Sequence, residues 1–145
     1  MMLMPDMNVL IYAHRADAPF HQPYHQWWNA LVNLPRPFAI STQVAIGFVR
    51  IVTQPNMPGG PTPLVGALAF IDDILARSNC RLIHPEADHW TRTAQLCRDS
   101  KATGKLVADA QHAAIAISAG CTWVTRDKDF SRFENYGLDW QHLVL

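Results

Sequence analysis

The sequence predicts an α/β fold, in which helices cover both faces of a short parallel sheet. Its 145 residues suit a single domain over residues 1–145 with a substantial core. Short apolar runs alternate with longer segments whose apolar residues recur at helical spacing. No internal repeat or low-complexity tract interrupts this alternation. In sheets of this class, sites form beyond the carboxyl ends of the strands.

The first elements are a strand over residues 2–4 and a helix over residues 8–16. Asp6 therefore falls in a strand-to-helix turn. Helical spacing then predicts a second helix over residues 25–33, and the apolar run at 38–40 predicts a second strand.

Ser41 or Thr42 can cap a third helix through Val52, because a hydroxyl at this position accepts a hydrogen bond from a first-turn amide. The prolines and glycines of residues 55–63 exclude regular structure and predict a loop. A helix over residues 64–76 follows.

The second half predicts a strand at 81–84, helices at 87–100 and 106–119, a strand at 121–125 and an edge strand at 143–145. On the helix over 87–100, helical spacing puts Trp90, Ala94 and Cys97 along one face. We expect most of the five tryptophans to serve the core rather than to stack on bases.

Composition excludes several classes of protein. Twelve basic residues balance twelve acidic ones, so contacts with nucleic acid have to come from local patches. Cys80, Cys97 and Cys121 lack the spacing of a disulfide framework or a zinc site. The chain shows no signal peptide and no membrane-spanning stretch, so we expect a cytoplasmic protein with no membrane partner.

Histidines do not predict a metal site. Pro23 lies between His21 and His25 and disfavours the regular helix that would bring the two rings together, and no HExxH motif occurs. His112, three residues after Asp109, is expected to pack beside the pocket.

Four aspartates carry the main functional signal. Asp6 follows the first strand, Asp109 opens an alanine-rich helix, and Asp127 and Asp129 follow the strand at 121–125. Converging carboxylates repel one another unless a cation neutralises them, and Mg²⁺ or Mn²⁺ prefers such oxygen ligands. Such an ion activates water for attack on a phosphodiester. Metal-assisted phosphodiester hydrolysis is the predicted chemistry.

Each aspartate also has a structural interpretation. Asp6 could cap a helix, Asp109 could favour a helix N-terminus through its dipole, and Asp127 with Asp129 could form a solvated turn. Receiver domains and haloacid-dehalogenase-like phosphatases also place aspartates at strand ends. The phosphatases, however, require Asp-x-Asp where this chain has Asp6-Met-Asn8.

Three segments resemble the motifs of the PIN domain, and most closely those of VapC toxins from toxin–antitoxin pairs. They are Pro5-Asp-Met-Asn-Val-Leu-Ile-Tyr-Ala13, Ala108-Asp-Ala-Gln-His-Ala-Ala114 and Val124-Thr-Arg-Asp-Lys-Asp-Phe130. The resemblance implies a three-layer α/β/α fold with a short, mainly parallel central sheet. It also implies a Mg²⁺- or Mn²⁺-dependent endoribonuclease that cleaves structured RNA such as tRNA or rRNA. A VapB-like antitoxin and a homodimer are the implied partners.

By matched position, the resemblance makes Asp6, Asp109 and Asp127 metal ligands and Asp129 a fourth or outer catalytic carboxylate. Asn8 and Thr125 are assigned to hydrogen bonds with these carboxylates or with metal-bound water.

Basic residues near the motifs are candidates for binding RNA phosphates, with ordinary surface charge as the alternative. Arg126 and Lys128 alternate with the aspartates and could instead offset local repulsion. The candidates are Arg15, Arg50, Lys105, Arg126 and Lys128.

One position departs from the family pattern. The family usually places a glutamate on the third helix, within a pattern like Gln-Val-x-x-Glu-Phe-Val-Arg, where this chain reads Gln43-Val-Ala-Ile-Gly-Phe-Val-Arg50. Gly47 therefore stands where the acid is expected. A catalytically weakened protein that binds RNA or an antitoxin is the alternative function.

Overall fold

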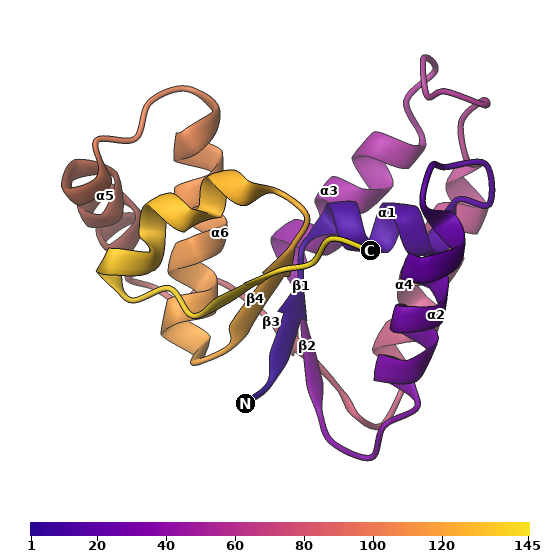
Figure 1. Cartoon of the computed structure of the whole chain (residues 1–145), viewed down its shortest axis with the longest axis horizontal. Helices are drawn as coiled ribbons and strands as arrows, with labels where there is room; N and C mark the ends of the chain where they lie inside the picture. Colours follow the sequence, from indigo (N-terminus) through magenta and orange to yellow (C-terminus); the bar gives the residue numbers. More distant parts are fainter.

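The computed structural model describes residues 1–145 and contains five strands, six α-helices and one 3₁₀ helix (Figure 1). In chain order they are β1 (Leu3–Pro5), α1 (Met7–His14), α2 (His21–Val32), β2 (Phe38–Ser41), α3 (Thr42–Val52), α4 (Leu64–Leu75), β3 (Cys80–Ile83), α5 (His89–Ser100), α6 (Lys105–Ala119), β4 (Thr122–Thr125), η1 (Lys128–Tyr136) and β5 (Trp140–His142).

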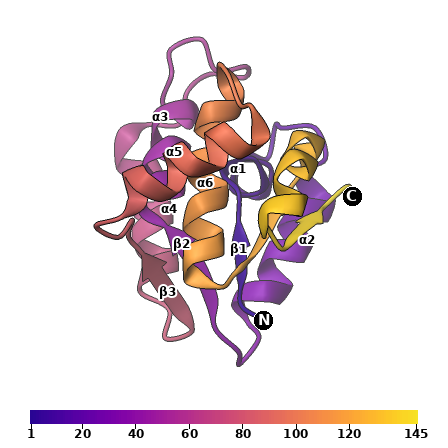
Figure 2. The same cartoon turned by 90° about the vertical axis from the view of Figure 1, so that its left-hand side faces the viewer.

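All strand pairs are parallel. β4 lies between β1 and β5, with Leu3 opposite Thr122 and Trp123 opposite Trp140. β2 pairs with β3 in a second ladder and runs beside β1 without a ladder joining them (Figure 2). Figure 1 shows α1 to α4 on one side of the strands and α5, α6 and η1 on the other. The predicted three-layer α/β/α architecture with a short parallel sheet is confirmed.

One main apolar cluster holds the layers together. It includes Met4 of β1, Ile40 of β2, Phe48 of α3, Trp123 of β4 and Phe133 of η1, each with no exposed surface. The cluster draws on strands and helices from both halves of the chain and so packs the two helical layers against the sheet. No helix of the protein has the length and apolar character needed to span a membrane.

The sequence located most elements to within a few residues. Ser41 is the cap of α3, because its Oγ accepts a hydrogen bond from the Val44 amide at 3.1 Å. The segment 55–63 has no helix or strand, as predicted.

Two expectations about helices were wrong. α2 begins at His21, because Pro23 lies in the first turn, where the missing amide hydrogen costs no helical bond. The rings of His21 and His25 consequently lie close together, with centroids 5.0 Å apart and their planes tilted by 33°. On α5 the buried residues include Thr93 and Leu96, and the Trp90 side chain lies outside the core; the other four tryptophans are buried or pack against it, as expected of most.

The C-terminal strand is also misplaced in the sequence prediction. β5 covers Trp140–His142, three residues before the expected 143–145. The amide of Leu143 donates to the Thr125 carbonyl at 2.7 Å, after which β4 offers no further strand residue. The 3₁₀ helix η1 was not predicted.

Candidate active site

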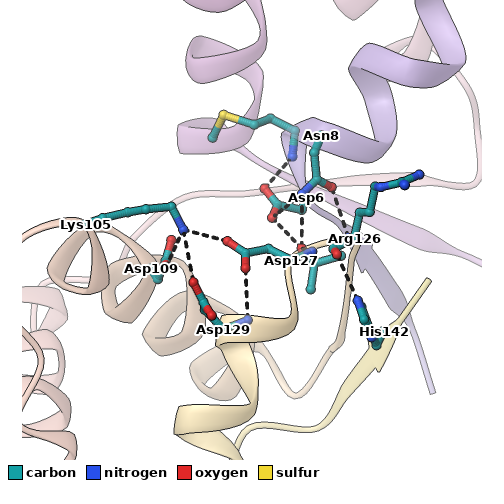
Figure 3. Close-up of polar contacts among 10 residues, drawn as sticks. Asp6, Asn8, Lys105, Asp109, Arg126, Asp127, Asp129 and His142 are labelled. Carbon is teal, nitrogen blue, oxygen red and sulfur yellow. Dashed lines mark hydrogen bonds and ion pairs between the residues drawn. The ribbon is translucent and has the colours of Figure 1, made fainter. Parts of the chain in front are cut away.

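The motif residues meet in one pocket at the carboxyl ends of β1 and β4 (Figure 3). Asp6 caps α1, Asp109 lies one turn into α6, and Asp127 lies between β4 and η1. The pocket has a volume of about 510 Å³. Its walls are Asp6, Met7, Asn8, Gln43, Ile46, Gly47, Arg50, Lys105, Ala108, Asp109, Gln111, His112 and Asp127.

Asp6 is held by the residues that the motifs pair with it. Its Oδ1 accepts a hydrogen bond from the Met7 amide at 2.6 Å, and its Oδ2 accepts one from Thr125 Oγ1 at 2.8 Å. Asn8 Nδ2 lies 3.4 Å from the same Oδ2 and 3.3 Å from Thr125 Oγ1. Asn8 and Thr125 therefore fix the orientation of Asp6, which also caps α1.

Lys105 joins the other three carboxylates (Figure 3). Its Nζ lies 2.6 Å from Asp127 Oδ2, 3.2 Å from Asp109 Oδ2 and 3.9 Å from Asp129 Oδ2. With the ammonium among them, no three acidic, histidine or cysteine side chains stand in a preassembled metal-binding arrangement. Asp129 contributes to this charge cluster but does not line the pocket.

Burial and Lys105 act on these carboxylates in opposite directions. Burial raises the pKa of Asp6 to about 6, against the hydrogen bonds from Thr125 and Met7. Burial also raises the pKa of Asp109, although Lys105 opposes it. Burial alone would raise the pKa of Asp127 too, but its hydrogen bonds with Lys105 and the Asp129 amide keep it below the usual range.

The donor set suits a hard divalent cation. Its charged ligand atoms are carboxylate oxygens, and the ammonium of Lys105 already occupies the position of a cation among them. Two residues that line the pocket, Gln43 and His112, each also have a buried polar atom, Oε1 and Nδ1, without a partner in the protein. The carboxylates are therefore of the ligand type that Mg²⁺ or Mn²⁺ takes, in a position where the Lys105 ammonium now stands.

At Gly47, the thioether of Met7 fills the space of the missing side chain. A Cβ added at Gly47 would lie 2.6 Å from Met7 Cε and 2.8 Å from its Sδ. A glutamate there requires Met7 to move, which its flexible side chain allows.

The basic residues proposed for RNA binding fall into different environments. Arg50 and Lys105 line the pocket. Lys128 follows Asp127 in the sequence and is exposed, but it does not line the pocket. Arg15 is buried against the 55–63 loop, where it donates to Asp17, to the Pro58 carbonyl and to Thr62. Arg15 thus anchors the 55–63 loop, and its guanidinium is not free to bind an RNA phosphate.

Arg126 points away from the carboxylates into an aromatic cage formed by Tyr12, Phe20 and Tyr24. Its guanidinium carbon lies 3.9 Å from the centroid of the Phe20 ring and 5.3 Å from that of Tyr12. Its Nη1 donates to the Tyr24 hydroxyl at 3.3 Å, and that hydroxyl donates to the Leu143 carbonyl at 2.6 Å. The guanidinium of Arg126 therefore stabilises the fold and does not face the pocket.

Several pocket residues were missed or given another role from the sequence. Met7, Ile46 and Gln111 line the pocket, yet they sit beside motif residues without carrying an obvious chemistry. Lys105, expected to bind RNA phosphates, instead forms ion pairs with Asp109 and Asp127. Its position four residues before Asp109, on the same helical face, was the available signal. His112 lines the pocket while stacking on Trp123 at 5.4 Å, and burial lowers its pKa to about 4.

Comparisons with known proteins agree with this geometry. Residues 3–136 match the PIN domain family. The chain is 37% identical over 141 residues to Ribonuclease VapC43 of Mycobacterium tuberculosis, covering 97% of this chain and 95% of that protein. It is 34% identical over 132 residues to Ribonuclease VapC31 of the same organism, covering 91% and 93% of the two chains.

Solved structures share the fold. VapC20 of Mycobacterium tuberculosis, described as a Sarcin-Ricin loop cleaving toxin, superposes with a TM-score of 0.68 at 19% identity, covering 99% of each chain. VapBC2 from Rickettsia felis, bound to a DNA fragment from its promoter, gives a TM-score of 0.68 at 20% identity, covering 97% of this chain and 98% of that one. With residues 3–136 matched to the family and these relatives aligned along nearly their whole length, the chain belongs to the PIN-domain family and, within it, to the VapC group.

Proposed function

We propose that the protein is a Mg²⁺- or Mn²⁺-dependent endoribonuclease toxin that cleaves structured RNA, such as tRNA or rRNA, and is neutralised by a VapB-like antitoxin. One observation carries the proposal: Asp6, Asp109 and Asp127 line a single pocket in a chain 37% identical to a VapC ribonuclease. The VapC20 structure, named for cleavage of the sarcin-ricin loop, supports ribosomal RNA as the substrate class. The VapBC complexes support the antitoxin partner.

Asp6, Asp109 and Asp127 would hold the ion, with Asp129 nearby as a further carboxylate. A bound divalent ion lowers the pKa of water and stabilises a leaving oxygen. Asn8 and Thr125 keep the Asp6 carboxylate in one orientation. Arg50, on the pocket wall, offers a cation to the RNA backbone.

A second candidate follows from Gly47, where Met7 occupies the place of the expected glutamate. In that case the protein binds RNA or an antitoxin through the same pocket but cleaves weakly. The two functions share the fold and differ in metal-dependent turnover.

The deciding experiment incubates antitoxin-free protein with total tRNA and rRNA in Mg²⁺, Mn²⁺ or EDTA. Four variants run beside it: Asp6→Asn, the exposed control Asp73→Asn, Gly47→Glu, and Gly47→Glu combined with Met7→Ala to clear the space. We expect discrete metal-dependent cuts in the parent and in Asp73→Asn, and none in Asp6→Asn. Cuts seen only when Gly47 is replaced by glutamate would establish the weakened binding protein instead.

A further inference from the structure

Trp90 is exposed, unlike the other tryptophans of the chain. Trp28 and Trp123 are buried, and Trp27 and Trp140 pack against the core. Trp90, in the first turn of α5, leaves 78% of its surface in solvent and pairs with no other aromatic ring. An exposed indole offers a large flat face and an N–H donor to a ligand.

The indole borders an open cleft of about 470 Å³ between α5 and α6. The cleft is lined by His89, Trp90, Thr93, Gly104, Val107, Ala108 and Gln111. Ala108 and Gln111 also line the acidic pocket, so the two cavities share a wall. A ligand bound at the carboxylates can therefore extend into the cleft.

The chemistry of the cleft suits a flat, uncharged group. It contains no carboxylate and no lysine or arginine. Thr93 is only 7% exposed, and its hydroxyl has no partner in the protein. The side chain of Gln111 likewise makes no hydrogen bond, and His89 adds an imidazole.

We propose that the Trp90 cleft is a subsite for one unpaired RNA base, stacked on the indole next to the acidic pocket. The inference rests on the proposed ribonuclease function and specifies its substrate as RNA with an unpaired base beside the cleaved bond. Stacking on an aromatic side chain tolerates any base, whereas polar groups at the base edge give preference. The wall that the cleft shares with the acidic pocket favours RNA over a peptide, because an RNA held at the carboxylates lies next to the indole.

The test measures RNA affinity in the Asp127→Asn background with Mg²⁺, in which we expect cleavage to be at least about 100-fold slower. The probes are a fluorescein-labelled single-stranded oligouridine and a duplex RNA of the same length. The variants are Trp90→Ala, Trp90→Phe and the control Tyr136→Ala. Tyr136 is also an exposed aromatic residue, but it lines a cleft that shares no residue with the acidic pocket.

We expect Trp90→Ala to weaken single-strand binding roughly 5- to 100-fold, the range for loss of one stacked base. Trp90→Phe should retain most of the affinity, and Tyr136→Ala and duplex binding should be unchanged. RNA should also quench tryptophan fluorescence in the parent but not in Trp90→Phe, which keeps four tryptophans as internal controls.

Single-strand affinity within twofold of the parent in Trp90→Ala, or equal losses for single strand and duplex, would overturn the subsite. Absence of any RNA binding by the parent protein would instead refute the proposed function.

Discussion

The acidic pocket and the aromatic cage start from neighbouring residues and have opposite character. Asp127 turns into the pocket, whereas Arg126 turns away from it (Figure 3). The guanidinium of Arg126 lies in the cage formed by Tyr12, Phe20 and Tyr24. In the cage the one cation meets three aromatic rings and a hydroxyl. In the pocket the one ammonium, on Lys105, faces three carboxylates while its side chain stays 65% exposed.

The side chains of the cage stabilise the fold, whereas those of the acidic pocket are available to bind a ligand. The contacts of Arg126 are satisfied within the protein, so a ligand there would break more than it forms. The pocket retains surplus negative charge and two buried polar atoms without partners. Proximity in sequence to a catalytic motif is therefore a weak guide to which side chains bind substrate.

The largest expected effect is on catalysis and tests the pocket. Asp127→Asn removes one charge and almost no volume. The side-chain oxygen of the asparagine can still accept the hydrogen bond from the Asp129 backbone amide. We expect RNA cleavage to fall about 100- to 1000-fold with circular dichroism unchanged, because the cation that would stabilise the charge of the transition state loses a ligand. Cleavage rates in Mn²⁺, measured against Asp73→Asn, provide the check, and a normal rate would remove Asp127 from the metal ligands.

The next effect is on stability and tests the cage. Arg126→Gln should lower the free energy of unfolding by about 2 kcal/mol, since it removes the cation–π contacts and a hydrogen bond. Urea denaturation measures this loss. Cleavage per folded molecule should persist, and a loss of cleavage without a loss of stability would return Arg126 to the RNA-binding set.

A smaller effect concerns Asp6 and pH. Because its pKa is raised to about 6 in the folded state, its contribution to stability is full below about pH 4 and is lost as the pH rises through 6. In EDTA at pH 7.5 we expect Asp6→Asn to be more stable than the parent by about 1 to 2 kcal/mol. The two proteins should converge at pH 4, as followed by thermal unfolding. A pH-independent difference would contradict the raised pKa.

The smallest effect concerns Lys105, whose ammonium must leave Asp109 and Asp127 when a metal binds. Lys105→Gln should tighten Mn²⁺ binding about threefold by calorimetry, a modest change because the Lys105 side chain is 65% exposed. Arg50→Gln lines the same pocket without touching a carboxylate and is the matched control. Weaker binding in Lys105→Gln would mean that the lysine instead holds the carboxylates in place.

Periodicity and caps predicted the fold well where local physics decides it. The Ser41 cap and the proline-rich loop depend on neighbouring residues alone, and both are confirmed. β5 depends on where β4 runs out of pairing residues, which no local pattern records. The exposure of Trp90 likewise depends on how α5 crosses α6, because helical spacing gives a face but not the neighbour that covers it.

The motifs placed Asp6, Asp109 and Asp127 correctly in one pocket because strand ends in a parallel sheet share an edge. The directions of Arg15 and Arg126 could not be predicted, since long basic side chains follow distant partners. Those partners are the 55–63 loop for Arg15 and α2 for Arg126.

The bond between Asp6 and Thr125, 119 positions apart, also bears on how the protein is made. β1 leaves the ribosome early, but its partner β4 and the turn carrying Asp127 are synthesised far later. Until then Asp6 has no partner residues to form the pocket with, because parallel strands so far apart in the sequence pair late. A growing chain is therefore harmless to the RNA around it, and its capacity to cut RNA appears only after most of the domain has been translated.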